Sequence, residues 1–64
     1  MYEKLRREMR KQGFSVHKLA MKSGISPSSL YHVFKGDLKF YDGWKQKISV
    51  TLNKTTKELF EEGE

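Results

Sequence analysis

"GISPSSLYHVFKG", residues 24–36, contains the start and stop signals of one short helix. Proline favours extended backbone in the residue before it and suits the first helical position, so Ser26 as a cap and Pro27 after it predict an N-terminus. Gly36 predicts the C-terminus, because glycine readily adopts the left-handed conformation that ends many helices. We therefore expect a helix from Pro27 to about Lys35.

This predicted helix has an apolar side and a polar side. At about 100° of rotation per residue, Leu30, Val33 and Phe34 fall on one side. The opposite side carries Ser28, His32 and Lys35, with Tyr31 at its flank and Ser29 at its edge. The apolar side predicts a contact with the core, which leaves the polar side available for another role.

Two helices are predicted before this stretch. Leu5 and Met9 recur at helical spacing, and Gly13 follows them as a stop signal. Ser15 is a good N-cap for a second helix, which ends before Gly24. These helices are expected over about residues 2–12 and 16–22.

A fourth helix is predicted after the stretch. Asp42 is expected to cap it, and Trp44, Ile48 and Leu52 then recur every four residues. Asn53 is expected to end it in the left-handed conformation.

A last short helix is predicted by Thr55 and Glu58, which have the spacing of a capping box and precede Leu59 and Phe60. Residues 61–64 read as a frayed acidic tail. Five helices with short connections predict a compact all-α fold.

The length and composition limit the classes of function. With 64 residues, the chain is expected to be one domain over 1–64, too small for a deep catalytic cleft. It contains no cysteine and two histidines far apart, which argues against a structural metal site. No apolar run is long enough to span a membrane and no signal peptide is evident, so we expect a cytoplasmic protein. Because the chain is small and has no catalytic or cofactor-binding motif, we expect no cofactor and no enzyme activity.

The positive charge is concentrated in the first two thirds of the chain. The net charge is +5, and residues 1–22 hold seven Lys or Arg against two acidic residues. Residues 23–54 hold five against two, whereas residues 55–64 hold one against four. Any attraction for a polyanion therefore belongs to residues 1–54.

The segment "FSVHKLAMKSGISPSSLYHVFKGD", residues 14–37, resembles the helix-turn-helix of the Cro and lambda-repressor type, a family of small bacterial and phage regulators. The resemblance extends over nearly the whole chain. It follows the order and spacing of Gly13, the Leu19-Ala20 pair, Gly24-Ile25-Ser26, Leu30 and Gly36, and continues into "TTKELF". It implies a lambda-repressor-like domain that regulates transcription by binding double-stranded DNA in a sequence-specific way.

In that family the helix after the turn enters the major groove, and the helix before it lies across the DNA backbone. The resemblance therefore implies that the helix over about residues 27–35 reads bases. The implied base-reading residues are Ser28, Ser29 and His32, with Pro27 and Tyr31 beside them. The implied phosphate-binding residues are Lys35, Lys39, Ser15 and Lys22.

The chain departs from the family pattern at three places. The glutamine common after the second helix's cap is Val16 here, which we expect to pack instead. An arginine and glutamate that often pair between the first helix and the reading helix are Met9 and Phe34, and replacing both partners with apolar residues is compatible with folding. The third departure is the aromatic start of the fourth helix, "FYDGW".

Members of this family usually bind DNA as twofold dimers, which implies a possible homodimer, at least on DNA. No small-molecule ligand is expected, because 64 residues leave no room for a separate effector domain. Tyr41, Leu59 and Phe60 are the candidate dimer or partner surface. The alternative function is a protein-interaction module on the same scaffold, such as an antitoxin-like or anti-repressor component. It would use aromatic anchors, namely Tyr31, Phe40, Tyr41 and Trp44.

Overall fold

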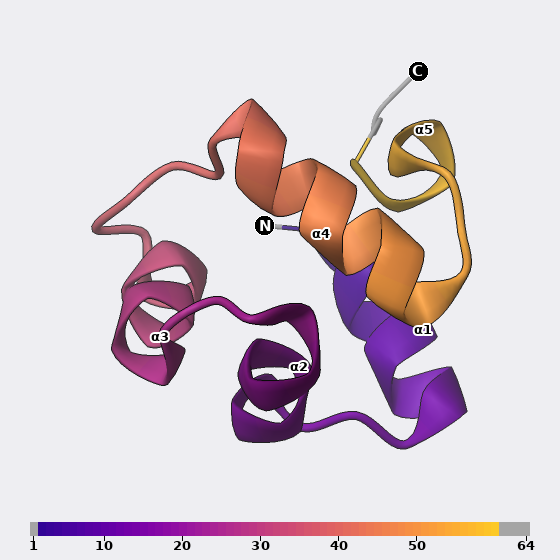
Figure 1. Ribbon diagram of the computed structural model, residues 1–64, viewed down its shortest axis with the longest axis horizontal. Helices are drawn as coiled ribbons and strands as arrows, with labels where there is room; N and C mark the ends of the chain where they lie inside the picture. Colours follow the sequence, from indigo (N-terminus) through magenta and orange to yellow (C-terminus); the bar gives the residue numbers. More distant parts are fainter. Residues whose placement is uncertain (1, 61–64) are drawn as a thin grey trace.

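The computed structural model describes residues 2–60, and over these residues the chain forms five α-helices and no strand (Figure 1). The helices are α1 (Glu3–Gln12), α2 (Val16–Ser23), α3 (Pro27–Lys35), α4 (Asp42–Leu52) and α5 (Thr56–Phe60). The all-α prediction is confirmed. The tail predicted for residues 61–64 lies outside the described residues.

The helix boundaries follow local signals in most places. Gly13, Gly24 and Gly36 end the first three helices with φ of 79°, 83° and 99°, and Asn53 ends α4 with φ of 57°. The hydroxyl of Ser15 accepts a hydrogen bond from the backbone N–H of Lys18 at 3.0 Å, as an N-cap does. These predicted boundaries are confirmed to within one residue.

One predicted cap, Asp42, differs from the structure, and another, Ser26, makes no side-chain cap bond. Asp42 is the first residue of α4, and Tyr41 occupies the N-cap position without a side-chain cap bond. A carboxylate in the first turn is still favourable, because it lies at the positive end of the helix dipole. Ser26 occupies the N-cap of α3 as predicted, but only its backbone carbonyl is used, by the N–H of Leu30 at 3.1 Å.

The predicted capping box of α5 is confirmed. The backbone N–H of Thr55 donates to Oε1 of Glu58 at 2.8 Å, and the N–H of Glu58 donates to the hydroxyl oxygen of Thr55 at 3.0 Å. The hydrogen bonds from the backbone and hydroxyl of Thr55, with a smaller contribution from the charge of Lys54, lower the pKa of Glu58 below its usual value of 4.5.

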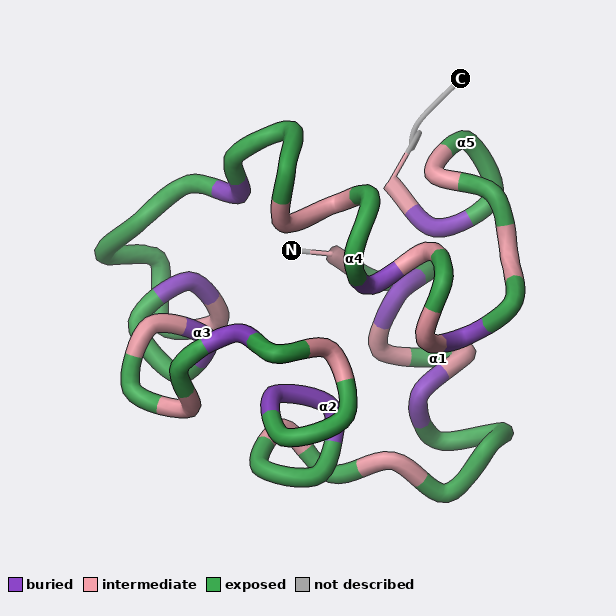
Figure 2. The backbone as a smooth tube through the Cα atoms, in the orientation of Figure 1, coloured by how far each residue is buried: buried purple, intermediate pink, exposed green. Residues whose placement is uncertain are grey.

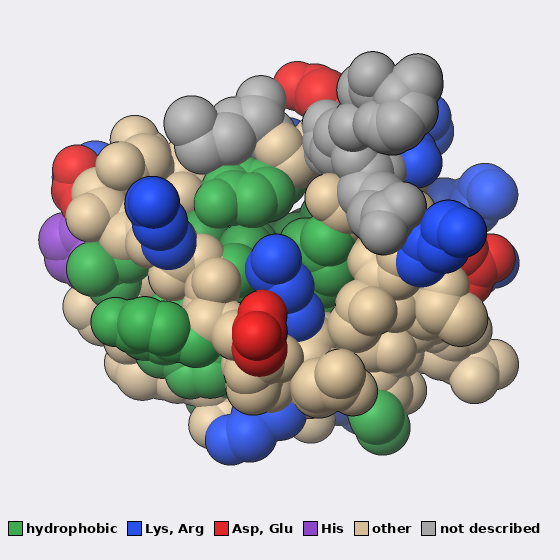
Figure 3. All heavy atoms as spheres, turned by 90° about the horizontal axis from the view of Figure 1, so that it is seen from above, with side chains coloured by type: hydrophobic (Ala, Val, Ile, Leu, Met, Phe, Trp, Pro, Cys, Tyr) green, Lys and Arg blue, Asp and Glu red, His purple; other side chains and the backbone are tan. Residues whose placement is uncertain are grey.

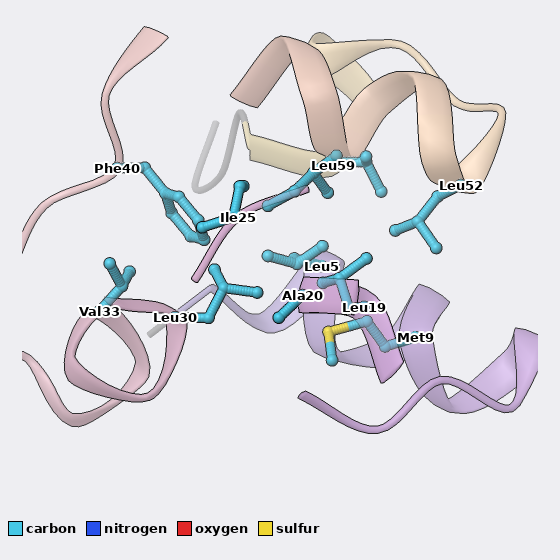
Figure 4. Packing of buried hydrophobic residues seen from close by; sticks show 11 residues of the cluster. Leu5, Met9, Leu19, Ala20, Ile25, Leu30, Val33, Phe40, Leu52 and Leu59 are labelled. Carbon is cyan, nitrogen blue, oxygen red and sulfur yellow. The ribbon is translucent and has the colours of Figure 1, made fainter. Parts of the chain in front are cut away.

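One hydrophobic core joins the helices (Figure 4). Figure 2 shows that buried positions alternate with exposed ones along the helices, so most helices present one side to the interior. The buried residues are Leu5, Met9, Leu19, Ala20, Ile25, Leu30, Val33, Phe40, Ile48, Leu52 and Leu59. Burial of these side chains is the main source of stability in a chain with no disulfide.

The helices pack in two connected groups. α1, α4 and α5 contact one another, and α2 contacts both α4 and α3. Figure 1 shows α3 at the edge of the molecule, next to α2 and away from α5. Among the helices, α2 therefore makes the main packing contact with α3.

A second attachment of α3 is an aromatic cluster, defined as Tyr2, Phe34, Phe40 and Phe60. Phe34, near the end of α3, meets Tyr2 and Phe40 edge to face, with ring centroids 6.1 Å apart in both pairs. Phe40 also lies 5.0 Å from Tyr2 and 5.1 Å from Phe60. Edge-to-face pairs at these separations are favourable, so the cluster ties the end of α3 to both ends of the described chain.

No helix within residues 2–60 is both long enough and apolar enough to cross a membrane.

Candidate nucleic-acid interface

The outer side of α3 is a row of exposed polar side chains. Ser28, Tyr31, His32 and Lys35 are exposed, and about half of the Tyr31 side chain is accessible. The other predicted base-reading residues, Pro27 and Ser29, are half-buried at the start of the helix. The polar side predicted from the sequence therefore faces solvent.

This orientation is set by the opposite side of the helix. Leu30 and Val33 are fully buried, and each lies in the core cluster together with Leu19 and Ala20 of α2 (Figure 4). The turn between the two helices begins at Gly24, whose positive φ is costly for any residue with a Cβ. Core packing and a tight turn together hold α3 at a fixed angle to α2.

The turn after α3 brings an acidic residue to His32. Gly36 donates its N–H to the carbonyl of Val33 at 3.0 Å, and Asp37 donates its N–H to the carbonyl of His32 at 2.8 Å. This is the Schellman arrangement, in which the chain folds back over the last helical turn. The Oδ2 atom of Asp37 then lies 3.2 Å from Nδ1 of His32.

Asp37 is not among the predicted site residues, although the sequence contains a signal for its position. A glycine directly after a helix predicts the Schellman turn, and that turn places the next residue over the helix residue five positions before it. Those two residues here are Asp37 and His32.

The predicted phosphate-binding lysines are all accessible. Lys35 is the last residue of α3, Lys39 lies in the following loop, and Lys22 lies near the end of α2. Ser15 is exposed at the start of α2, where its oxygen already accepts the N–H of Lys18 and its O–H remains a donor. In Figure 3, Lys and Arg side chains stand between exposed hydrophobic side chains on the face seen from above.

Arg6 makes a contact with α3 that has no local sequence signal. Its guanidinium donates a hydrogen bond to the backbone carbonyl of Phe34 at 3.2 Å and lies 4.7 Å from the centre of the Phe34 ring. α1 is thus joined to the end of α3 by Arg6, whose guanidinium contacts both the carbonyl and the ring of Phe34.

Met9, Val16 and Phe34 line one small hollow beside this contact, and Val16 is half-buried there. The expectation that Val16 packs is confirmed.

Part of the predicted partner surface is wrong. Leu59 is only 1% exposed and belongs to the core, because the apolar side of α5 packs against α1 and α4. Phe60 is half-buried against Phe40 and the Lys45 ammonium group. Tyr41 alone of the three is well exposed, at 62%.

Two of the four aromatic anchors predicted for a protein-interaction module pack against other residues of the chain. Phe40 is buried in the core, and Trp44 is half-buried with its ring 4.7 Å from that of Tyr41. The remaining exposed anchors are Tyr31 and Tyr41, which lie on different elements.

The exposed side of α3 and the turn after it carry the residue types of a serine hydrolase, namely serine, histidine and aspartate, but in a different arrangement. Asp37 contacts His32, whereas no hydrogen bond joins Ser28 to His32 within residues 2–60. The described part of the chain also brings no three His, Asp or Glu side chains close enough to hold a metal ion.

No protein-family model, curated protein or solved structure matches the chain.

Proposed function

We propose that the chain is a sequence-specific DNA-binding regulator of the helix-turn-helix type, similar to the Cro and lambda-repressor family. In this proposal α2 and α3 are the two helices of the motif, and α3 enters the major groove. The observation that carries it is the exposed polar side of α3, held outward by the burial of Leu30 and Val33. The major groove of B-DNA, about 12 Å wide, admits one such helix.

Base reading is assigned to side chains at the start and middle of α3. The hydroxyls of Ser28 and Ser29 can donate to or accept from base edges, and the imidazole of His32 offers one ring nitrogen beyond the one that contacts Asp37. Tyr31 and Pro27 lie beside them and present apolar surface suited to a thymine methyl group.

Affinity is assigned to phosphate contacts. Lys35 and Lys39 lie at the end of α3 and in the loop after it, where the resemblance implies contacts to the DNA backbone. Ser15 and Lys22, at the two ends of α2, are further contacts of the same kind. Such contacts release counterions, so binding should weaken steeply as salt is raised.

Dimerisation on DNA is also part of the proposal. A single helix-turn-helix reads a short half-site, and two copies related by a twofold axis place their reading helices about one helical turn apart. Of the three residues predicted for a contact between copies, Tyr41 is the one that is well exposed.

The test is selection from random DNA duplexes at about 0.15 M salt, where generic electrostatic binding is already weakened. We expect a short enriched motif, as two half-sites about 10 base pairs apart for a dimer. The double variant Ser28→Ala with His32→Ala should lose the sequence preference and keep salt-sensitive binding. An unchanged preference in that variant would refute the assignment of α3 as the reading helix.

A second experiment separates positioning from reading. Replacing Lys35 and Lys39 with Gln should weaken binding to all duplexes and reduce the salt slope by about 0.9 for each phosphate that is no longer neutralised. The control is Lys57→Gln, which removes one charge from the exposed surface of α5, away from α3. Because the double variant removes two charges, an effect of the control half as large would show that only the net charge matters.

The alternative is a protein-interaction module that uses the exposed Tyr41 and its neighbour Trp44 to bind a partner. It predicts that no DNA motif is enriched.

A further inference from the structure

The contact between His32 and Asp37 involves both the backbone and the side chains. The two residues are joined by the turn at Gly36, in which the Asp37 N–H donates to the His32 carbonyl at 2.8 Å. Their side chains meet at the same place, with Nδ1 of His32 3.2 Å from Oδ2 of Asp37. The side-chain contact is thus supported by the backbone and does not depend on two long, freely rotating groups.

The contact determines which ring nitrogen carries the proton. An ionised carboxylate accepts hydrogen bonds and cannot donate one, so Nδ1 of His32 must be the N–H donor in this pair. In an uncharged imidazole the other nitrogen, Nε2, then has a lone pair and is an acceptor. The side chain of His32 remains about half exposed, so its ring is accessible from solvent.

An acceptor at this position discriminates among bases. In the major groove, adenine presents its N6 amino group and cytosine its N4 amino group, whereas guanine presents only the acceptors N7 and O6. A lone pair on Nε2 can be satisfied by either amino group and by neither guanine atom.

We propose that Asp37 is a specificity-determining residue, which holds the Nδ1–H form of His32 so that Nε2 accepts a hydrogen bond from adenine or cytosine. The inference rests on the proposed function, because it concerns the base that α3 reads. Asp37 acts through His32 and is therefore a positioning residue. Without it the imidazole is able to place its proton on Nε2 and donate to guanine instead.

The first test needs no DNA. The ¹⁵N chemical shifts and two-bond couplings of the His32 ring identify the protonated nitrogen in the folded protein. At an alkaline pH at which the same spectra show an uncharged ring, we expect the Nδ1–H form in the wild type and a shift toward Nε2–H in Asp37→Ala. A wild-type spectrum dominated by Nε2–H would overturn the proposal whatever the DNA result.

The second test is selection from random duplexes at the same pH. The position that loses its preference in His32→Ala is the position that His32 reads. At that position we expect adenine or cytosine in the wild type, and a relative gain of guanine of about threefold to tenfold in Asp37→Ala, which has no acceptor for Nδ1–H; this is the range expected for a single hydrogen bond. The control is Asp42→Ala, which removes the same charge from the exposed start of α4 and should leave that position unchanged.

The outcomes distinguish this inference from the proposed function. A wild-type protein that enriches no motif overturns the proposed function and the role of Asp37 with it. A wild-type motif that depends on His32 but is identical in Asp37→Ala, or that prefers guanine, overturns the role of Asp37 alone. A similar change in Asp42→Ala would assign the effect to net charge and would also overturn it.

Discussion

Replacing Arg6 with methionine removes the contact that joins the first helix to the end of α3. The guanidinium of Arg6 donates to the Phe34 carbonyl at 3.2 Å and lies 4.7 Å from the centre of the Phe34 ring. Methionine keeps a long apolar stem but removes both the charge and the donor. Arg7, the next residue, is exposed, so Arg7→Met makes the same chemical change without this contact.

The expected loss of stability follows from the two parts of the contact. A hydrogen bond from a charged donor contributes about 1.5–3 kcal/mol, and a cation above an aromatic ring near the surface about 0.5–1 kcal/mol. Because Arg6 is half-buried and methionine recovers part of its packing, we expect Arg6→Met to cost about 1.5–3 kcal/mol. A chain of this size has a total stability of about 3–10 kcal/mol, so the change is large.

Thermal unfolding followed by circular dichroism measures this effect. At about 4–8 °C per kcal/mol, Arg6→Met should lower Tm by about 6–24 °C, whereas Arg7→Met should change stability by less than about 0.5 kcal/mol. Phe34→Leu keeps the carbonyl and removes the ring, so a double-mutant cycle with Arg6→Met should give a coupling of about 0.5–1 kcal/mol. Equal stabilities of Arg6→Met and Arg7→Met would refute the contact.

Further predictions concern the stability of the helical framework. The hydrogen bonds from Thr55 lower the pKa of Glu58, so the stabilisation from its charge is present above about pH 4.5 and is lost as pH falls through the lower folded-state pKa. Glu58→Gln has no carboxylate to protonate, so Tm should fall less steeply on acidification in this variant. Gly24→Ala should cost about 1–2 kcal/mol in chemical denaturation, because φ is +83° although no atom lies within 4 Å of the added Cβ. Gly43→Ala, also open but inside α4, should instead stabilise by about 0.4–1 kcal/mol, and equal signs for the two glycines would contradict the backbone argument. Leu30→Ala should cost about 2–5 kcal/mol and lower Tm accordingly, since Leu30 is fully buried; a cost below about 1 kcal/mol would mean that α3 is not anchored by its apolar side.

The helices and the orientation of α3 could be predicted because their signals are local. Caps and left-handed residues such as Ser15, Gly36 and Asn53 act within one helical turn, and the apolar spacing of Leu30 and Val33 fixes which side is buried. Such features depend on neighbouring residues alone, so the sequence contains most of what determines them.

The contacts between distant residues could not be predicted in the same way. Arg6 and Phe34 are 28 residues apart, and nothing in either segment indicates that a guanidinium will lie on that ring. The sequence also suggests a surface role for Leu59 and Phe40, because an apolar residue near the end of a short element looks the same whether a core or a partner covers it. Only the packing of the described helices shows that both are buried.

The separation between the two sides of α3 has a consequence for how such a protein can diversify. Ser28, Tyr31 and Lys35 are exposed, belong to no core contact, and make no side-chain hydrogen bond within residues 2–60. Substitutions there should be almost neutral for folding, since exposed positions away from caps and networks usually change stability by less than about 0.5 kcal/mol. A library that varies these three positions on an unchanged scaffold should consist mostly of folded proteins, from which new binding preferences can be selected without compensating mutations elsewhere.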